Sequence, residues 1–262
     1  MNVMTADFPL SRILRCYLLE ARCEFMRLLR TPSFVVPCLS FPAVFYLLFG
    51  VILGGTRGSS GMASYLLATY GVFGIMGVAL FGFGVTVAIE RERGFLTLKR
   101  ALPMPPGALL FAKTAMAMNF ASMVSLILAI IALTLAGVSL APWQWLALFA
   151  VNVLGVLPFA AIGLLIATLC SGQASPAIIN LIYLPMAFLS GLWMPLSILP
   201  GWIAGAAPVW PSYHLSQIAL HVVGRNVGQG IGLHLGYLAA ITLVCFLLAR
   251  KRLLSLNQMG KG

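Results

Sequence analysis

Residues 58–113 read GSSGMASYLLATYGVFGIMGVALFGFGVTVAI followed by ERERGFLTLKRALPMPPGALLFAK, and this change in composition decides the fold. Residues 58–89 carry no charged side chain, whereas residues 90–113 are rich in arginine, lysine and glutamate. A helix that crosses a bilayer needs about 20 mostly apolar residues. The stretch therefore predicts a membrane-spanning helix that runs into a charged segment outside the lipid.

The rest of the 262-residue chain repeats this alternation. Hydrophobic residues make up 61% of it and charged residues only 8%, with a mean hydropathy of +1.03; a soluble domain carries about 25% charged residues. Backbone in lipid must satisfy its own hydrogen bonds, so the charge-free stretches are expected to be helical. The sequence thus predicts an all-α integral membrane protein with six transmembrane helices, at about 34–53, 65–89, 113–137, 146–169, 176–192 and 231–249.

The basic residues indicate the orientation. Of 16 lysines and arginines, only Arg57 and Arg225 fall in the alternate loops; the others lie before the first span, in residues 90–113 or after the last span. This positive-inside pattern predicts that both termini are cytoplasmic. The net charge of +11 is therefore a topology signal, and membrane lipid is the expected contact for it rather than nucleic acid.

The N-terminal segment, residues 1–32, is predicted to be a cytoplasmic amphipathic helix. Apolar residues such as Leu14, Leu18 and Phe25 share one arc at 100° per residue, and the charged residues lie on the other arc or its edge. Such a helix lies in the membrane interface. Packing against another part of the protein is the alternative, and the two arrangements are compatible.

Residues 90–110 form the most charged segment that lies between two spans. Glu90, Arg91, Glu92, Arg93 and Gly94 open it, and a short stretch with an apolar and a basic side follows. Two interpretations stand side by side: a solvated loop with stop-transfer charges, or a helix that docks a cytoplasmic partner. All acidic residues of the chain lie outside the spans, which weighs against proton- or cation-coupled transport without excluding it.

Residues 193–230 are apolar but interrupted by prolines, including Pro195, Pro200 and Pro211. Because proline removes a helix hydrogen bond, this segment is not one continuous span. It is expected to form short helices that re-enter the outer leaflet before the last span.

Residues 90–113 resemble the first inner loop of ABC-2 type permeases, the membrane subunits of ABC exporters. The matching positions are Glu90, Arg91, Glu92, Gly94, Leu98, Lys99, Arg100, Pro103 and Lys113; Phe95 departs from the threonine common there. A second match, to the outer re-entrant element of that family, comprises Ser190, Gly191, Pro195, Pro200, Pro211 and Tyr213. The resemblance covers nearly the whole chain as a single domain, 1–262, and is nearest to the branch that exports drugs and lipo-oligosaccharides.

The resemblance implies a permease that moves an amphiphile (a drug, lipid or glycolipid) out of the cytoplasm or inner leaflet. It implies an ABC ATPase as a separate partner, which binds ATP and Mg, and a second copy of this chain or a close homologue. Glu90, Glu92 and Arg93 are the loop residues most expected to couple the two subunits, together with Arg91, Gly94, Leu98, Lys99, Arg100 and Pro103. The sequence lacks the phosphate loop G-x-x-x-x-G-K-[ST], in keeping with a chain that binds no cofactor itself. The expected location is a bacterial plasma membrane.

Other functions find less support in the residues. A stand-alone carrier or channel is the main alternative, and an intramembrane enzyme is a weaker one. Ser190 with His214 is the nearest candidate for a hydrolase pair, but serine and histidine at this spacing prove nothing. His214 and His221 lie two helical turns apart, yet a metal site needs more ligands, so no metal is expected.

Overall fold

The computed structural model describes residues 9–53, 60–101, 104–105, 107–225 and 230–259, and every regular element in these ranges is helical. The helices are α1 (Leu10–Leu29), α2 (Pro32–Phe45), η1 (Tyr46–Ile52), α4 (Ser60–Gly77), η2 (Val78–Val85), α5 (Thr86–Glu92), α6 (Phe95–Ala101), α7 (Ala108–Thr134), α8 (Pro142–Leu154), α9 (Val156–Leu169), α10 (Ser175–Leu189), η3 (Leu196–Ile198), α11 (Gly201–Ala206), η4 (Ala207–Val209), α12 (Pro211–Val222) and α13 (Ile231–Met259). The all-α fold predicted from the sequence is confirmed.

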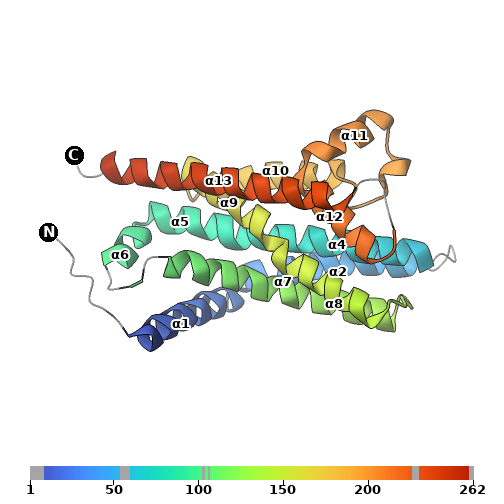
Figure 1. The fold of residues 1–262 in the computed structure, drawn as a ribbon, viewed down its shortest axis with the longest axis horizontal. Helices are drawn as coiled ribbons and strands as arrows, with labels where there is room; N and C mark the ends of the chain where they lie inside the picture. Colours follow the sequence, from blue (N-terminus) through green and yellow to red (C-terminus); the bar gives the residue numbers. More distant parts are fainter. Residues whose placement is uncertain (1–8, 54–59, 102–103, 106, 226–229, 260–262) are drawn as a thin grey trace.

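The long helices run side by side along one axis (Figure 1). The start of α1, the short helix α6 and the end of α13 lie at one end of this bundle, which we call the charged end. The short helix α11 lies at the opposite end, which we call the α11 end. Because consecutive long helices alternate in direction, charged segments far apart in the sequence meet at one end.

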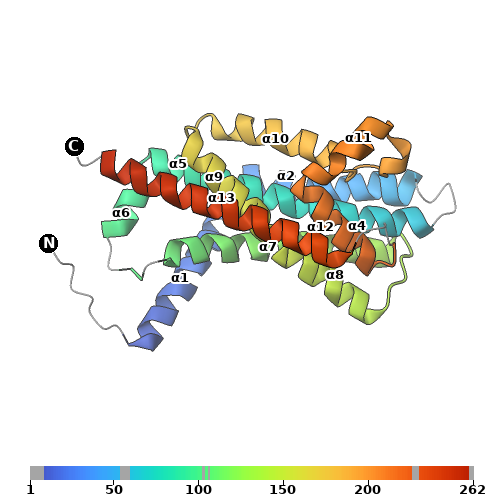
Figure 2. The same cartoon turned by 45° about the horizontal axis from the view of Figure 1, so that its top comes forward.

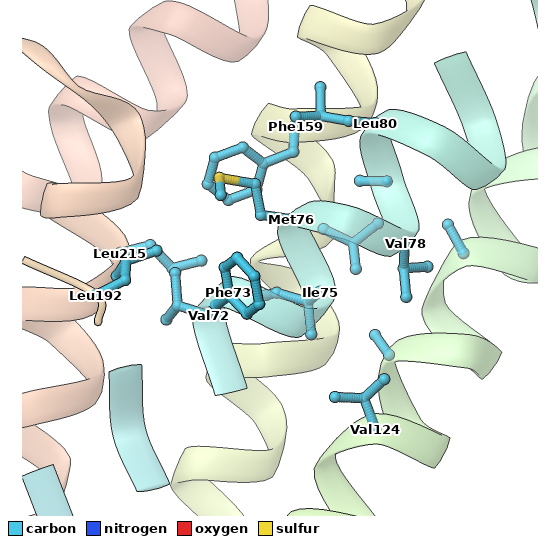
Figure 3. Close-up of a cluster of buried hydrophobic side chains, with 14 of the residues drawn as sticks. Val72, Phe73, Ile75, Met76, Val78, Leu80, Val124, Phe159, Leu192 and Leu215 are labelled. Atoms are coloured by element: carbon cyan, nitrogen blue, oxygen red, sulfur yellow. The ribbon is translucent and has the colours of Figure 1, made fainter. Parts of the chain in front are cut away.

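The helix formed by α4, η2 and α5 is the centre of the bundle. In the span Gly61–Glu92, 72% of the most apolar 18-residue stretch is buried inside the protein. The corresponding share for the span in α13 is 17%. Figure 3 shows Val72, Met76 and Val78 of this central helix among buried side chains from neighbouring helices. A Cβ atom on Gly84 would lie 3.0 Å from the Cα of Gly163, so only glycine allows this approach of η2 and α9.

Five described helical stretches are long and apolar enough to cross a membrane: Pro32–Ile52, Gly61–Glu92, Ala108–Thr134, Pro142–Leu169 and Ile231–Leu253. They match five of the six predicted spans. The fifth predicted span corresponds to α10, which has only 15 residues and a length of about 22 Å, less than the hydrocarbon core of about 30 Å. It ends early because Gly191 adopts a left-handed conformation, with φ +74°. The count of six stays a prediction.

The predicted boundary of the second span is wrong by about one turn. The sequence placed the end of the helix at Ile89, because the charged residues begin at Glu90. In the structure the helix continues to Glu92, and Glu90 is only 4% exposed. Charged side chains that find partners can remain inside a helix bundle, so charge alone misplaced the end.

The predicted N-terminal helix is present as α1, which slants away from the axis of the bundle (Figure 2). It packs on α7, where the rings of Tyr17 and Phe111 lie 5.3 Å apart, and it leaves Leu14 and Leu18 exposed. The arrangement therefore combines packing against the protein with an exposed apolar stripe. Its position in a membrane interface stays a prediction.

The predicted series of short helices before the last span is also present, as η3, α11, η4 and α12 between α10 and α13. Pro195 and Pro200 precede η3 and α11, and Pro211 is the first residue of α12. Proline fits a first helical turn, where the missing N–H has no partner in any case. Whether this element re-enters a leaflet is not decided by its helices alone, and that part stays a prediction.

Candidate functional site

Six charged side chains from four helices meet near the charged end of the bundle. We call them the ion-pair cluster; its members are Glu20, Glu24 and Arg27 of α1, Glu90 of α5, Lys99 of α6 and Lys113 of α7. Three carboxylates face three cations, so the cluster is neutral. It links the N-terminal helix to both flanks of the charged loop.

Two lysines connect the cluster. The Nζ atom of Lys99 lies 2.5 Å from Glu20 and 2.7 Å from Glu24. The Nζ atom of Lys113 lies 3.3 Å from Glu24 and 3.0 Å from Glu90. Glu20 and Glu24 present their carboxylates on one face of α1 because residues four apart are neighbours on a helix.

Arg27 completes the cluster from the same helix. Its guanidinium pairs with Glu24 at 2.7 Å and also with Glu90 of α5. Glu24 therefore has three cationic neighbours, on α1, α6 and α7. It is the central acid of the cluster, and α1 is joined through it to both other helices.

Burial makes these ion pairs important for stability. Lys113 is 1% exposed, Glu24 3% and Glu90 4%. A buried charge without a partner is costly, so each of these residues depends on the others. Burial acts to raise the pKa of Glu24, yet the cations around it, Lys113 first, outweigh burial and lower that pKa. Burial acts to lower the pKa of Lys99, yet its carboxylate partners Glu20 and Glu24 raise it. Both groups are thus held in their charged forms.

The helix α6 has one anchored face and one exposed face. Lys99 points to the cluster, whereas Phe95 is 46% exposed and Leu98 59% exposed. Gly94 provides the turn before α6, with φ +75°, a conformation that favours glycine. Arg93 is also exposed. The side chain of Arg100 and the whole of Pro103 lie outside the described residues.

Arg91 and Glu92 point away from the cluster, toward the loop that joins α9 to α10. Arg91 donates to the carbonyl oxygens of Thr168 and Cys170 at 2.9 Å and 2.6 Å. Glu92 accepts the backbone N–H of Gly172 at 2.5 Å. The sequence grouped these two residues with the partner-facing loop, and their contact with a second loop was not predicted.

Of the residues assigned to the outer element, Ser190 and Gly191 make hydrogen bonds to other helices. The hydroxyl groups of Ser190 and Ser212 are hydrogen-bonded to each other, and Ser190 also donates to the carbonyl of Met186 at 2.5 Å. The carbonyl of Gly191 accepts the hydroxyl of Tyr65 at 2.8 Å. Tyr213 is buried at the start of α12. These contacts fasten the end of α10 to α4 and α12.

The histidines are arranged differently from the sequence-based candidates. His214 Nδ1 lies 2.8 Å from His234 Nδ1, and His214 Nε2 lies 2.8 Å from the carbonyl oxygen of Pro208. Both ring nitrogens of His214 are therefore engaged, and neither contacts Ser190. Among the described residues no group of three or more metal-ligating side chains gathers. The pair of His214 with His234 was missed because the two lie on different helices.

An aromatic groove lies between α2, α4 and α10, with a volume of about 470 Å³. Asn180 is a polar residue in its lining. Most of the wall consists of aromatic rings, which include those of Phe41, Phe45, Phe73, Phe81, Tyr183 and Trp193. The Phe73 and Tyr183 rings stack with centroids 5.0 Å apart. Ligand sites are commonly concave and apolar with few polar groups, and this groove has that character.

Comparison with known proteins identifies the family. The family model described as "ABC-2 type transporter" matches residues 17–223. A protein of Bacillus subtilis (strain 168) named "Putative transport permease YvfS" is 26% identical over 241 residues, which cover 89% of this chain and 96% of that protein. The match takes in α2 to α12, including the charged loop. The chain therefore belongs to the ABC-2 type transporter family and is a multi-pass membrane transport permease.

Proposed function

We propose that this chain is the permease subunit of an ATP-driven exporter, and that its charged end binds a separate ABC ATPase in the cytoplasm. The family supports a transport role, and the sequence has no phosphate loop of its own. ATP and Mg then belong to the partner subunit. The positive-inside distribution of lysine and arginine supports a cytoplasmic charged end with both termini on that side.

The exposed face of α6 is the observation that carries this proposal. Phe95 and Leu98 are exposed at the charged end of the bundle, beside exposed Arg93 and Gly94. Neighbouring exposed apolar side chains outside the lipid favour a contact with another protein when they form part of a larger apolar patch, and we propose that Phe95 and Leu98 form part of such a patch. The opposite side of α6 is fixed by the pairs of Lys99 with Glu20 and Glu24. A helix held on one side and apolar on the other is suited to receive force from a partner.

The ion-pair cluster gives this force a path into the membrane. Closure of the ATPase subunits on ATP would displace α6. Through Lys99 the displacement would reach α1, and through Glu24 it would reach Lys113 at the start of α7. Paired, buried charges resist separation, so these helices would move together.

The aromatic groove supports an amphiphilic substrate. Its ring-lined wall suits an apolar or aromatic body, and Ser33 and Asn180 add polar groups to the lining. We propose a drug, lipid or glycolipid as the class of cargo.

One chain with a groove of this size does not enclose a large amphiphile, and we propose that two copies, or this chain and a close homologue, form the pore with two ATPase subunits. Native mass spectrometry of the active complex tests this: a single permease chain per active complex would contradict it. The proposed location is a bacterial plasma membrane.

The deciding experiment is capture of the ATPase from the native membrane by the tagged chain. Leu98→Asp should reduce capture by about tenfold or more, because it places a charge in an apolar contact. Leu19→Asp is the matched control, since Leu19 is an exposed leucine of α1 outside α6. Equal capture by the parent and by Leu98→Asp would contradict the docking role of α6. A thiol introduced at Leu98 should react only after the cells are permeabilised, and labelling of intact cells would refute the orientation.

A further inference from the structure

The loop between α9 and α10 is held by α5 through a set of contacts that the proposed docking does not use. Arg91 donates to the carbonyls of Thr168 and Cys170, and Glu92 accepts the N–H of Gly172. We call Arg91, Glu92 and Gly172 the loop clamp. The carbonyls that Arg91 binds are at the end of α9, where no helical N–H is left to bind them.

The backbones on the two sides of the loop clamp touch. Gly172 is buried, and a Cβ atom at this position would lie 2.8 Å from the Cα of Ile89 and 2.6 Å from the Glu92 carboxylate. No side chain fits between them. The guanidinium of Arg91 is a rigid planar fork, so its two hydrogen bonds fix direction as well as distance. Displacement of α5 therefore moves the loop directly.

The loop continues into the wall of the aromatic groove. Ser175, the first residue of α10, is fully buried and donates to the carbonyl of Gly172 at 2.8 Å. Two turns further along α10, Tyr183 lines the groove and donates to the carbonyl of Phe73 on α4 at 3.2 Å. Contacts thus run without a gap from α5 through Gly172 to α10 and the groove.

We infer that the loop clamp carries the displacement of α6 to α10 and thereby changes the width of the aromatic groove. The inference rests on the proposed function, because an ATPase must supply the displacement. Glu90, Arg91 and Glu92 are consecutive, and successive residues of a helix point about 100° apart. Glu90 therefore faces the ion-pair cluster while its neighbours face the loop, and α5 distributes one movement to both sides. Arg91 is a positioning residue in this scheme, and Gly172 is the residue that admits the contact.

The test uses the permease bound to the ATPase that copurifies with it. In a background without the five native cysteines, spin labels are placed at Val44 of α2 and Leu181 of α10, which are both exposed and whose helices belong to opposite walls of the groove. Their distance distribution is measured without nucleotide and with ATP plus vanadate. The parent should show a nucleotide-dependent shift. Arg91→Gln, which removes the fork, and Gly172→Val, which separates the loop from α5, should both lose that shift.

Two controls separate coupling from folding and from docking. Lys251→Gln removes an exposed charge at the same end of the bundle and should keep the full shift. Arg91→Lys keeps a charge that can reach one carbonyl and should restore part of the shift. Both clamp variants should still capture the ATPase, because Gly172 is buried and the exposed face of α6 is unchanged.

The outcomes distinguish the two proposals. A full shift in Arg91→Gln and Gly172→Val, with the ATPase bound, overturns the inference alone. Failure of the parent chain to capture any ATPase overturns the proposed function and this inference together. Capture by the parent without any shift on α10 keeps the docking proposal and overturns the inference. If Gly172→Val does not fold, Arg91→Gln and its lysine counterpart still decide the question.

Discussion

Replacing Lys113 by methionine should be among the most damaging single changes at the charged end of this protein. Lys113 is 1% exposed and lies between Glu24 and Glu90, which are 3% and 4% exposed. Methionine keeps most of the length of the side chain but not its charge. Glu24 would then keep Arg27 and Lys99, Glu90 would keep only Arg27, and the cluster would carry a net charge of −1.

The expected magnitude follows from the burial of all three groups. Removing one partner from a buried ion pair costs about 3–5 kcal/mol when the other charge is left without compensation. Because Arg27 and Lys99 still contact these carboxylates, we expect the lower end of that range, about 3 kcal/mol. At about 2–4 °C per kcal/mol for a chain of this size, the midpoint of thermal unfolding should fall by about 10 °C. The assay is thermal unfolding of the purified chain in detergent, followed by intrinsic fluorescence. Lys251→Met is the matched control and should shift the midpoint by about 1 °C or less, since Lys251 is exposed.

A second substitution distinguishes electrostatics from packing. Glu90→Gln added to Lys113→Met restores a neutral cluster, so the double variant should be more stable than Lys113→Met alone, with a coupling of about 1–3 kcal/mol. The reasoning is refuted if Lys113→Met is no worse than Lys251→Met. It is also refuted if the two changes at Lys113 and Glu90 simply add.

Two further predictions concern the same end of the bundle. The folded-state pKa of Glu24 lies below its unfolded value, so its contribution to stability is present above about pH 4.5 and is lost as pH falls through the folded pKa. The midpoint of thermal unfolding should therefore fall between pH 6 and pH 3, and it should fall less in Glu24→Gln. A midpoint that does not change over this range, or that changes equally in Glu24→Gln, would contradict this. Gly94→Val should strain the left-handed turn before α6, at φ +75°, by about 1–2 kcal/mol without a clash, since nothing lies within 4 Å. ATPase capture should fall in Gly94→Val and survive in Gly94→Asn, because asparagine tolerates this conformation; equal capture by both variants would show that the turn does not position α6.

The sequence predicted the membrane helices well because their signal is local. Long charge-free stretches and the surrounding basic residues locate five spans within a few residues. The fifth predicted span corresponds to α10, which ends at Leu189 before the left-handed Gly191; a hydropathy window does not detect such an end, and this span stays a prediction. The spans also contain two π-helical stretches, η1 with seven residues and η2 with eight. The charge pattern does not predict them.

The candidate site was found only in outline. The motif that begins at Glu90 indicates where the candidate site lies, but it does not predict where its side chains point. The carboxylate of Glu90 points inward and pairs with Arg27 and Lys113. The carboxylate of Glu92 accepts the backbone N–H of Gly172, and a pattern of residue types does not predict a contact with a backbone atom. The spacing of Glu20 and Glu24 on α1 was a usable signal, since two acids on one helical face require cations opposite them. Their partner Lys99 lies 75 residues from Glu24, beyond the reach of any local pattern.

The composition of the ion-pair cluster suits the force-transmitting role that we propose for it. Its three acids and three cations balance, and the contacts of Glu24 and Lys99 move both pKa values away from neutrality. Near pH 7 Glu24 and Lys99 therefore stay charged, and the ion pair between them persists. The exposed Phe95 and Leu98 on the other side of α6 contribute binding surface without adding charge to be balanced. A short helix built in this way can exchange partners on its outer face while its inner contacts stay intact, and the proposed docking of a separate ATPase would require both properties.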